Sequence, residues 1–335
     1  MERLEEQFEG ALARIEVSGP KRDRAIKAHE EMREVLEADP KLQEWGIETV
    51  LIGSYARRTG IYPGKDVDVF VKLTKLTTEN AQPATVYNRV RDVLVDHYGE
   101  RAKPQARSIK VEFDFDGDGF SVDAVPAVRM GERWGIPRRK TELWESPDVA
   151  ERWVETDPEK LAELTTERNK SPKVGHQGAY VPTVKLVRQT RRHHLGDQKP
   201  GGLYFEILTF WAFQSGAITG DCFAEILAQT LRAVATQLAT GEATTDPVLG
   251  RPYKPTPERD DLANAAEKFD ELTAKAEDAL RADKCKAAAL WREILGKNGR
   301  GWVFGLPAGC DEQGNKVPVA GAVAARGSRE ASPFA

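Results

Sequence analysis

The 335-residue sequence is poor in cysteine, and its three cysteines, Cys222, Cys285 and Cys310, lie far apart. An odd number of distant cysteines predicts reduced thiols, and it argues against a disulfide framework or a CxxC zinc site. The sequence also lacks any apolar run close to the ~18 residues that span a bilayer. Its charged, helix-like N-terminus has no apolar core of a signal peptide. We therefore expect a cytoplasmic protein without a membrane segment.

An excess of positive charge is missing as well. The formal net charge is −4, whereas proteins that bind long nucleic acids usually show a broad basic excess. We therefore expect no long nucleic acid as a partner, while a small anionic ligand held by a local basic patch stays open. With 40% hydrophobic and 30% charged residues, the chain has the composition of a globular protein, and its length suits roughly two domains.

The two halves of the chain differ in their hydrophobic pattern. The first half mixes helical periodicity with short β-branched runs, and the second half is helical. We predict an α+β fold with a core domain over 1–150 that includes the N-terminal helices, a helical lobe over 151–307 and a loose tail over 308–335. The expected helices are 2–38 with an interruption at Ser18-Gly19-Pro20, 83–98, 158–168, 180–194, 202–216, 221–240 and 257–294, and the expected strands are 47–52, 67–73, 107–115 and 120–125.

The acidic stretch DFDGDGF, residues 114–120, imitates the start of an EF-hand calcium loop. The twelfth position of such a loop is a glutamate, but here it is Val125, and the flanking sequence is strand-like. We interpret the stretch as the turn of a β-hairpin that joins the last two predicted strands.

Two aspartates, Asp66 and Asp68, open a β-branched run. On a strand, residues two apart project from the same face, so the two carboxylates point together while Val67, Val69 and Val71 face the core. At ~6 Å such carboxylates repel by roughly 3 kcal/mol at an effective dielectric near ~20, and a divalent cation turns that repulsion into attraction. A solvated acidic pair at a strand edge is the alternative interpretation.

Two further features favour a metal-dependent nucleotide site. Gly53-Ser54 follows the first predicted strand, where glycine lets the backbone approach a ligand and the following N–H groups can contact phosphate oxygens. A plain turn is the alternative. Asp123 lies inside the β-branched run FSVDAVPAV, where a polar side chain is unexpected unless it is paired or bound to metal. Three aspartates on neighbouring strands could hold two Mg²⁺ or Mn²⁺ ions for nucleotidyl transfer.

The stretches GSYARRTGIYPGKDVDVFV and SVDAVPAV resemble the hG[GS]…DhDh…hDh signature of the polymerase-β-like nucleotidyltransferases. In the second half, WVETDP, Asn169, YVPTVKLVRQTRRHH, KPGGLYFEILTFWAF and Asp246-Pro247 resemble the bacterial CD-NTase family, the cGAS/DncV-like members of that superfamily. The resemblance covers roughly residues 20–305. It implies a polymerase-β-like core of mixed sheet and helices, joined to a C-terminal helical lobe, with the nucleotide site in the cleft.

The resemblance also implies an activity and roles for individual residues. The family makes cyclic di- or trinucleotide second messengers from NTPs, often purine NTPs and commonly in bacterial anti-phage (CBASS) signalling, which implies a downstream effector reached through the product. In some family systems a conjugating protein acts on the extreme C-terminus, so Pro333-Phe334-Ala335 is a candidate site for a regulatory or conjugating partner. The matching positions are Asp66, Asp68 and Asp123 for the catalytic, metal-binding triad, Gly53 and Ser54 for contacts to the donor triphosphate, and Lys185 for a lysine that reaches the triphosphate from the helical lobe.

Other charged residues have two interpretations each. One predicted helix carries a basic face, which either contacts the triphosphate or growing oligonucleotide or is simply solvated. Arg138-Arg139-Lys140 has the same two interpretations. Glu206, inside an apolar helical run, either supports the site or orients its helix. The basic face consists of Lys185, Arg188, Arg191 and Arg192.

Two other functions stay open from the sequence. A tRNA or RNA-terminal nucleotidyltransferase of the same superfamily would need an extended basic RNA-binding region, and the acidic balance argues against one. An inactive nucleotide-binding regulatory module would usually have lost a carboxylate or the Gly-Ser pair, and here all of them are present. The sequence therefore favours an active synthase.

Overall fold

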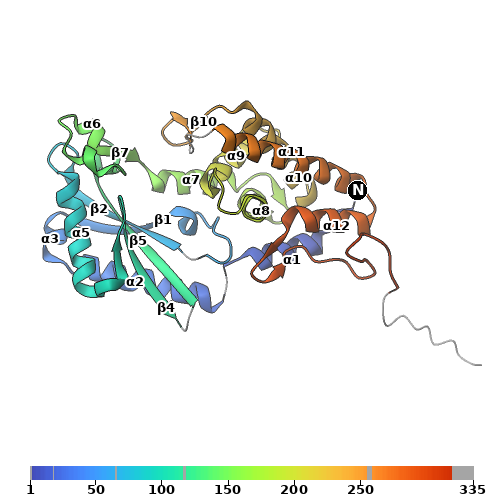
Figure 1. Cartoon of the computed structure of the whole chain (residues 1–335), viewed down its shortest axis with the longest axis horizontal. Coiled ribbons are helices and arrows are strands. Elements are labelled where there is room, and N and C mark those ends of the chain that lie inside the picture. Colours follow the sequence, from blue (N-terminus) through green and yellow to red (C-terminus); the bar gives the residue numbers. More distant parts are fainter. Residues whose placement is uncertain (1, 18, 65, 116–117, 255–258, 319–335) are drawn as a thin grey trace, which may run out of the picture.

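The protein consists of two lobes placed end to end (Figure 1). The computed structural model describes residues 2–17, 19–64, 66–115, 118–254 and 259–318. One lobe is built around a mixed β-sheet, and the other is a bundle of helices. Over the residues so described, no helix is both long enough and apolar enough to cross a membrane. The expectation of an α+β fold is confirmed.

A seven-stranded sheet forms the first lobe. Its central strands, β2 (Asp66–Thr77) and β5 (Asp118–Met130), run parallel to each other, and the other neighbouring pairs are antiparallel. The order across the sheet is β1 (Ile47–Ile52), β2, β5, β4 (Ile109–Phe115) and β3 (Ala102–Pro104), while β6 (Arg133–Pro137) pairs with both β5 and β7 (Trp153–Thr156).

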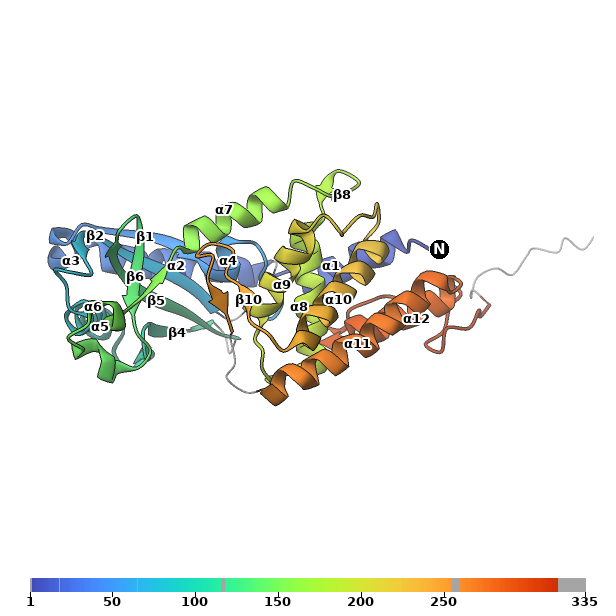
Figure 2. The same cartoon turned by 90° about the horizontal axis from the view of Figure 1, so that it is seen from above.

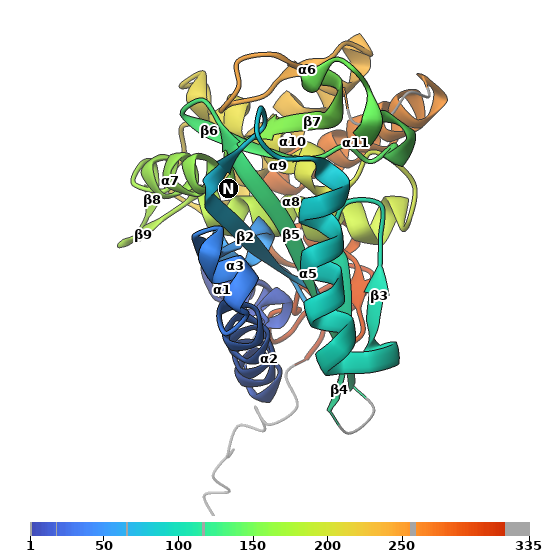
Figure 3. The ribbon, with the colours of Figure 1, turned by 90° about the vertical axis from the view of Figure 1, so that its left-hand side faces the viewer.

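Alternation along β2 divides this sheet into two unlike faces. Val67, Val69 and Val71 are at most 1% exposed and pack in one core with α2 (Pro20–Glu37) and α5 (Pro83–Tyr98). Figure 3 shows both helices beside the sheet. Each of them begins with a proline, which is favourable at the first helical position. The opposite face carries Asp68 and Asp123 toward the cleft, and further along the same two strands Phe70 and Ala127 form a small second core with Trp134 and Ile136 of β6.

Short elements complete the sheet lobe and its connections. They are α3 (Pro40–Glu44), α4 (Gly53–Ala56), α6 (Val149–Arg152) and the 3₁₀ turns η1 (Gly99–Arg101) and η2 (Thr141–Glu145). In the described part of the chain, three two-stranded ribbons lie outside the main sheet: β8 (Lys173–Val174) with β9 (Gln177–Gly178), β10 (Thr244–Thr245) with β11 (Pro252–Tyr253), and β12 (Lys297–Asn298) with β13 (Gly301–Trp302).

The second lobe packs its helices around a separate aromatic core. Phe205 and Phe269 lie with ring centroids 4.8 Å apart at its centre. The pattern over 257–294 predicts one helix, but the chain forms two, because the Asp283 carboxylate accepts hydrogen bonds from the N–H groups of Cys285 and Lys286 and caps a new helix. The helices are α7 (Pro158–Arg168), α8 (Tyr180–Leu195), α9 (Gly202–Gln214), α10 (Phe223–Thr240), α11 (Arg259–Arg281) and α12 (Lys284–Leu295) (Figure 2).

The sequence pattern gives no sign of β6 or β7. β6 contains Gly135 and Pro137, which are poor strand formers, and each strand is held mainly by its pairing with a neighbour. The hairpin expected at DFDGDGF is confirmed, because β4 and β5 pair antiparallel as far as Phe115 and Asp118. Residues 116–117 of its turn lie outside the described part of the chain.

The first helix, α1 (Glu5–Ile15), packs in the helical lobe and not in the sheet lobe. The Phe8 ring lies 5.2 Å from the Trp291 ring and 5.0 Å from the Phe304 ring, both in edge-on contact. This differs from the expectation that the N-terminal helices belong to a core domain over 1–150. The apolar face of α1 packs in the helical core, and of the two N-terminal helices only α2 covers the sheet, together with α5.

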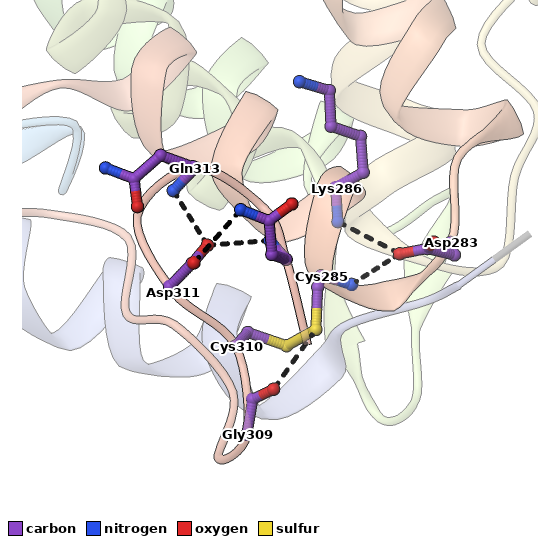
Figure 4. The surroundings of a disulfide bond; sticks show 8 residues. Asp283, Cys285, Lys286, Gly309, Cys310, Asp311 and Gln313 are labelled. Carbon is purple, nitrogen blue, oxygen red and sulfur yellow. Dashed lines mark hydrogen bonds between the residues drawn. A yellow bond between two sulfur atoms is a disulfide. The ribbon is translucent and has the colours of Figure 1, made fainter. Parts of the chain in front are cut away.

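The expectation of reduced, unpaired cysteines is wrong for two of the three. Cys285, in the first turn of α12, forms a disulfide with Cys310, and the two Cα atoms are 5.1 Å apart (Figure 4). Cys222 is free and buried. The described part of the expected loose tail, 308–318, is held by this bond and by a turn in which the Asp311 carboxylate accepts N–H groups from Gln313 and Asn315. Residues 319–335 lie outside the description.

Because the disulfide closes a loop over a sequence separation of 25, its reduction should lower the stability of the helical lobe by about 3 kcal/mol. We expect a lower unfolding temperature in dithiothreitol than in oxidising buffer, measured by calorimetry on the full chain. The double variant Cys285→Ser/Cys310→Ser should unfold at one temperature in both buffers. A wild-type protein insensitive to the reductant would contradict the stabilising role of the bond.

Candidate active site

The polar face of the sheet brings three carboxylates together. In the parallel pairing of β2 with β5, Asp68 lies opposite Asp123, and Asp66 lies opposite Ser121. The antiparallel pairing of β1 places its last residue, Ile52, opposite Asp68. Since side chains alternate along a strand, all three carboxylates project from the face that α2 and α5 leave uncovered. The structure therefore assembles the three aspartates that the sequence pattern singles out.

Burial and mutual repulsion favour protonation of these carboxylates. Burial is the main cause that raises the pKa of Asp68 from 3.8 to about 6, followed by the charges of Asp123 and Asp66, while Arg57 opposes the rise. The pKa of Asp123 is raised by burial and then by Asp66, with Lys110 opposing. A cation between the carboxylates would favour their ionised forms and offset the effects of burial and mutual repulsion.

The same carboxylates have hydrogen-bonding capacity to spare. Oδ1 of Asp123 is buried and has no hydrogen-bond partner in the described part of the chain. Oδ1 of Asp66 accepts a hydrogen bond from the Ser121 hydroxyl at 2.6 Å. Buried carboxylate oxygens without a partner are rare in proteins, and carboxylate oxygens are preferred ligands of hard divalent cations. The donor set of Asp66, Asp68 and Asp123 therefore fits a divalent metal.

Gly53 lies in contact with this group and has no room for a side chain. It follows β1 directly, with a φ of +70°, and a Cβ atom built on it would lie 2.0 Å from Oδ2 of Asp68. Only glycine combines this backbone conformation with so close an approach. The close approach of Asp68 thus requires a glycine at position 53.

These residues line one wall of a cleft between the lobes. Gly53, Asp68 and Asp123 come from the sheet lobe, and Leu203 and Ile207 of α9 face them from the helical lobe. The cleft has a volume of about 890 Å³, within the ~300–1,000 Å³ common for small-molecule sites. It is large enough for a nucleotide.

Ser54 and Lys185 lie in a different hollow from Gly53. A cavity of about 700 Å³ behind the end of β1 is lined by both residues, together with Arg22 and Arg58. The Lys185 ammonium forms an ion pair with Glu16, and its side chain is only 9% exposed. The structure thus places Gly53 with the carboxylates and Ser54 with Lys185.

A buried ion pair that the sequence leaves ambiguous joins the two lobes. Nε of Arg57, just after α4, donates to Oε1 of Glu206 on α9 at 2.6 Å, and the two side chains are 6% and 3% exposed. The Thr59 hydroxyl donates to the same carboxylate at 3.1 Å. Arg188 of α8 donates to the Thr59 carbonyl at 2.8 Å. Of the two interpretations of Glu206, the structure favours the one in which this residue supports the site. In the sequence, the signal for this role is a single acidic residue within an apolar helix.

The basic face of α8 is occupied by protein partners and is not simply solvated. Arg191 donates to the carbonyls of Pro200 and Gly196, and Arg192 donates to the carbonyl of Tyr62. Together with the contacts of Lys185 and Arg188, these hydrogen bonds attach α8 to the neighbouring loops. The sequence shows the face but gives no sign of its partners.

A tighter acidic group lies elsewhere, at the start of α10. Ligand atoms of Asp221, Cys222 and Glu225 all lie within 4.8 Å of one another. The Asp221 carboxylate forms an ion pair with Arg3 at 2.7 Å, and Glu225 accepts a hydrogen bond from the Asp221 N–H at 3.3 Å. Both carboxylates thus already have protein partners, and exposed acidic groups are common without an ion, so we assign no metal to this group.

A mixed sheet with this arrangement of aspartates, facing a helical lobe across a cleft, is the architecture of a polymerase-β-like nucleotidyltransferase. Comparison with known proteins narrows the class. The family described as Second Messenger Oligonucleotide or Dinucleotide Synthetase domain matches residues 3–169. The cyclic AMP-AMP-AMP synthase of Acinetobacter sp. (strain ATCC 27244 / 9458) is 28% identical over 307 residues, which cover 87% of this chain and 84% of that protein.

Solved structures show the same fold. CdnC of E. coli MS115-1, in complex with ATP, superposes with a TM-score of 0.66 at 16% identity and covers 88% of this chain and 98% of its own. The Bradyrhizobium diazoefficiens CD-NTase CdnG, in complex with GTP, gives 0.67 at 13% identity and covers 88% and 96%. CdnC in its complex with HORMA-deltaN gives 0.65 at 16% identity and covers 90% and 98%. The chain belongs to the bacterial CD-NTase family, and it is a nucleotidyltransferase that produces cyclic oligonucleotides.

The substitution Gly53→Ala should reduce pyrophosphate release by about a hundredfold, because its Cβ must displace the Asp68 carboxylate by an ångström or so. Gly131→Ala is a matched control: Gly131 also has a positive φ, +62°, but a Cβ there meets nothing within 4 Å. That control should lose about 1 kcal/mol of stability and keep its activity. Equal activity of the two variants would contradict the contact.

Without metal, Asp68→Asn should stabilise the protein at neutral pH. The folded-state pKa of Asp68 lies above its unfolded value, so its contribution to stability falls as the pH rises from 3.8 to about 6. Above that window the cost is roughly 3 kcal/mol, and the asparagine removes it. We expect a higher unfolding temperature for the variant at pH 7.5 in EDTA, and no gain near pH 4. The control variant Asp96→Asn changes an exposed residue of α5 and should have the unfolding temperature of the wild-type protein at every pH. If the difference in unfolding temperature between Asp68→Asn and the wild-type protein does not change with pH, the ionisation of Asp68 is not its cause.

Proposed function

We propose that the cleft of Asp68 and Asp123 joins ATP or another purine NTP into a cyclic di- or trinucleotide. The observation that carries this is the set of three carboxylates on one sheet face, with a buried oxygen of Asp123 that has no partner among the described residues. In this proposal Asp66, Asp68 and Asp123 hold two divalent ions, Mg²⁺ or Mn²⁺. When bound, the ions supply the positive charge that offsets the triphosphate and its leaving group.

The protein's own residues bind and orient the two substrates. The carboxylates fix the place where the α-phosphate of the donor lies, and Gly53 leaves the backbone close to that place. The Ser54 hydroxyl and the Lys185 ammonium are proposed to contact the donor triphosphate. For Lys185 this means exchanging its ion pair with Glu16 for a phosphate, since the two anions compete for one ammonium.

The reaction forms one bond and breaks one at each step. The 2′ or 3′ hydroxyl oxygen of the acceptor bonds to the α-phosphorus of the donor, the bond from that phosphorus to the bridging oxygen of the β-phosphate breaks, and pyrophosphate leaves. The hydroxyl proton passes to a carboxylate or to water. A last step within the bound linear chain closes the ring. The similarity to a cyclic AMP-AMP-AMP synthase over most of both chains favours adenine nucleotides.

The proposed setting is cytoplasmic anti-phage signalling, in which the product activates a downstream effector. The CdnC structure with HORMA-deltaN supports a regulatory protein partner as part of the proposal. A conjugating partner at Pro333-Phe334-Ala335 belongs to the proposal as well, on residues outside the described part of the chain.

The test is an assay of the product. The pure protein is incubated with all four NTPs, each labelled in turn at the α-phosphate, with Mg²⁺ or Mn²⁺, and then treated with phosphatase. A cyclic product has no terminal phosphate and keeps its label, so we expect a small phosphatase-resistant species that contains adenine. Label appearing only on added RNA would instead indicate an RNA-terminal nucleotidyltransferase.

The variant Asp66→Asn/Asp68→Asn is the control for the site. It keeps the shape of both side chains but loses two of the charges that hold the ions, so it should fold and lose product formation. Retained synthesis by this variant would show that the chemistry takes place elsewhere.

A further inference from the structure

The disulfide between Cys285 and Cys310 presents its two sulfur atoms unequally to solvent. Cys285, in the first turn of α12, is 3% exposed, and its Sγ lies 3.6 Å from the carbonyl oxygen of Gly309 (Figure 4). Cys310 lies in the loop that follows β13 and is half-buried. A disulfide is opened by a thiolate that attacks one of its sulfurs. The sulfur that a thiolate can reach here is that of Cys310.

The buried sulfur is placed to leave as a thiolate. When Cys310 is attacked, the electron pair of the broken bond goes to Sγ of Cys285, the second residue of a 12-residue helix. The partial positive charge of a helix N-terminus stabilises a thiolate there. Lys284 and Lys286 add positive charge on either side in the sequence, and the capping carboxylate of Asp283 opposes them. Because a stabilised thiolate leaves faster, attack at Cys310 is favoured by both access and leaving group.

The disulfide fastens residues 308–318 to α12, and the other contacts between them are weaker. Glu312 forms an ion pair with Arg292 at 2.7 Å, but the Glu312 side chain is 64% exposed, and exposed pairs add little stability. Gly314 lies against α12 so closely that a Cβ on it would meet the Cβ of Ala289 at 3.3 Å. A glycine buries little apolar area in such a contact. The covalent bond is therefore the main link.

The same residues form a unit that separates cleanly from the lobe. Phe304, just before them, is fully buried in the core of the helical lobe and stays there when the bond opens. Within the segment, the Asn315 N–H donates to the Asp311 carboxylate at 2.7 Å, and the Val317 N–H donates to the Gly309 carbonyl at 2.9 Å. These hydrogen bonds do not involve α12, so they give the segment no further hold on the helix.

We propose that Cys285 and Cys310 are a reversible redox site, which a low-molecular-weight thiol opens at Cys310, and that its opening frees residues 308–318 from α12. The lining of the cleft includes neither cysteine, so the inference is independent of the proposed reaction. The segment links the helical lobe to residues 319–335. The redox state therefore decides whether the chain leaves the folded lobe near residue 307 or near residue 318.

The exchange takes two steps and uses two molecules of the thiol. In the first step a thiolate bonds to Sγ of Cys310, the bond to Cys285 breaks, and Cys285 leaves as a thiolate. In the second step another thiolate attacks the sulfur of the bound thiol and frees Cys310. The protein disulfide gains two electrons and two protons and becomes two thiols, while the two small thiols become one disulfide. An excess of the small disulfide reverses both steps.

The first test follows the exchange itself. The oxidised full-length protein is mixed with reduced glutathione, sampled over time into acid, and its thiols are counted by alkylation in denaturant and mass spectrometry. The count should rise from one, Cys222, to three, and fall back to one in oxidised glutathione. The early glutathione adduct should be on Cys310. A count that stays at one in excess glutathione, or an adduct on Cys285, would overturn the proposed site.

The second test measures the release of the segment by brief hydrogen exchange, during which buried helices stay protected. The N–H groups of Asn315 and Val317 should exchange at least about tenfold faster in the reduced protein than in the oxidised one, while α8 and α9 stay protected in both. Glu312→Gln is the matched control, because it removes the charge paired with Arg292 and keeps the disulfide. In its oxidised form it should exchange as the oxidised wild-type protein does.

Two results would contradict the release. One is unchanged exchange of Asn315 and Val317 in protein whose three thiols have been counted, which would show that the segment stays on α12 without the bond. The other is equally fast exchange of α8 and α9 in the reduced protein, which would show that the bond holds the whole helical lobe and not this segment.

Discussion

The buried ion pair of Arg57 and Glu206 is the interaction on which the rest of the site depends. Arg57 belongs to the sheet lobe and lines the cleft, and Glu206 belongs to the helical lobe, so the pair ties the two lobes together beside the cleft. Removing one partner of such a pair leaves an uncompensated buried charge, at a cost of about 3–5 kcal/mol. The same guanidinium opposes the rise in the pKa of Asp68. One side chain therefore influences both the placement of the lobes and the charge of the carboxylates.

The cleft that results is lined by both strands and loops. Asp68 and Asp123 come from strands, and the pairing of β2 with β5 fixes their relative positions. Arg107 and Arg139 lie in loops that leave the same sheet, and the lining also includes Asp157 and Asp246. Rigid elements thus hold the two carboxylates, while loops supply other charged groups of the lining. This division is common in proteins that bind ligands on loops supported by a scaffold.

The local features of this fold could be predicted from the sequence, and the long-range ones could not. The bounds of α5 and α7 agree with the periodicity, and the alternation around Asp66 and Asp68 predicts their common face. Nothing in the local pattern shows that Cys285 lies beside Cys310, because that contact depends on how the chain returns past α12. The partner of Glu206 and the position of Lys185 beside Glu16 depend in the same way on the packing of one lobe against the other.

The position of α1 has a consequence for the order in which the protein folds during synthesis. The sheet lobe uses residues up to β7, so it can fold while the helical lobe is still being made. Phe8, however, packs on Trp291 and Phe304, which leave the ribosome about 300 residues later. At roughly 5–20 residues per second, that interval is about 15–60 s. The apolar face of α1 is therefore made first and covered last, and during this interval it is the part of the nascent chain open to chaperones or to aggregation.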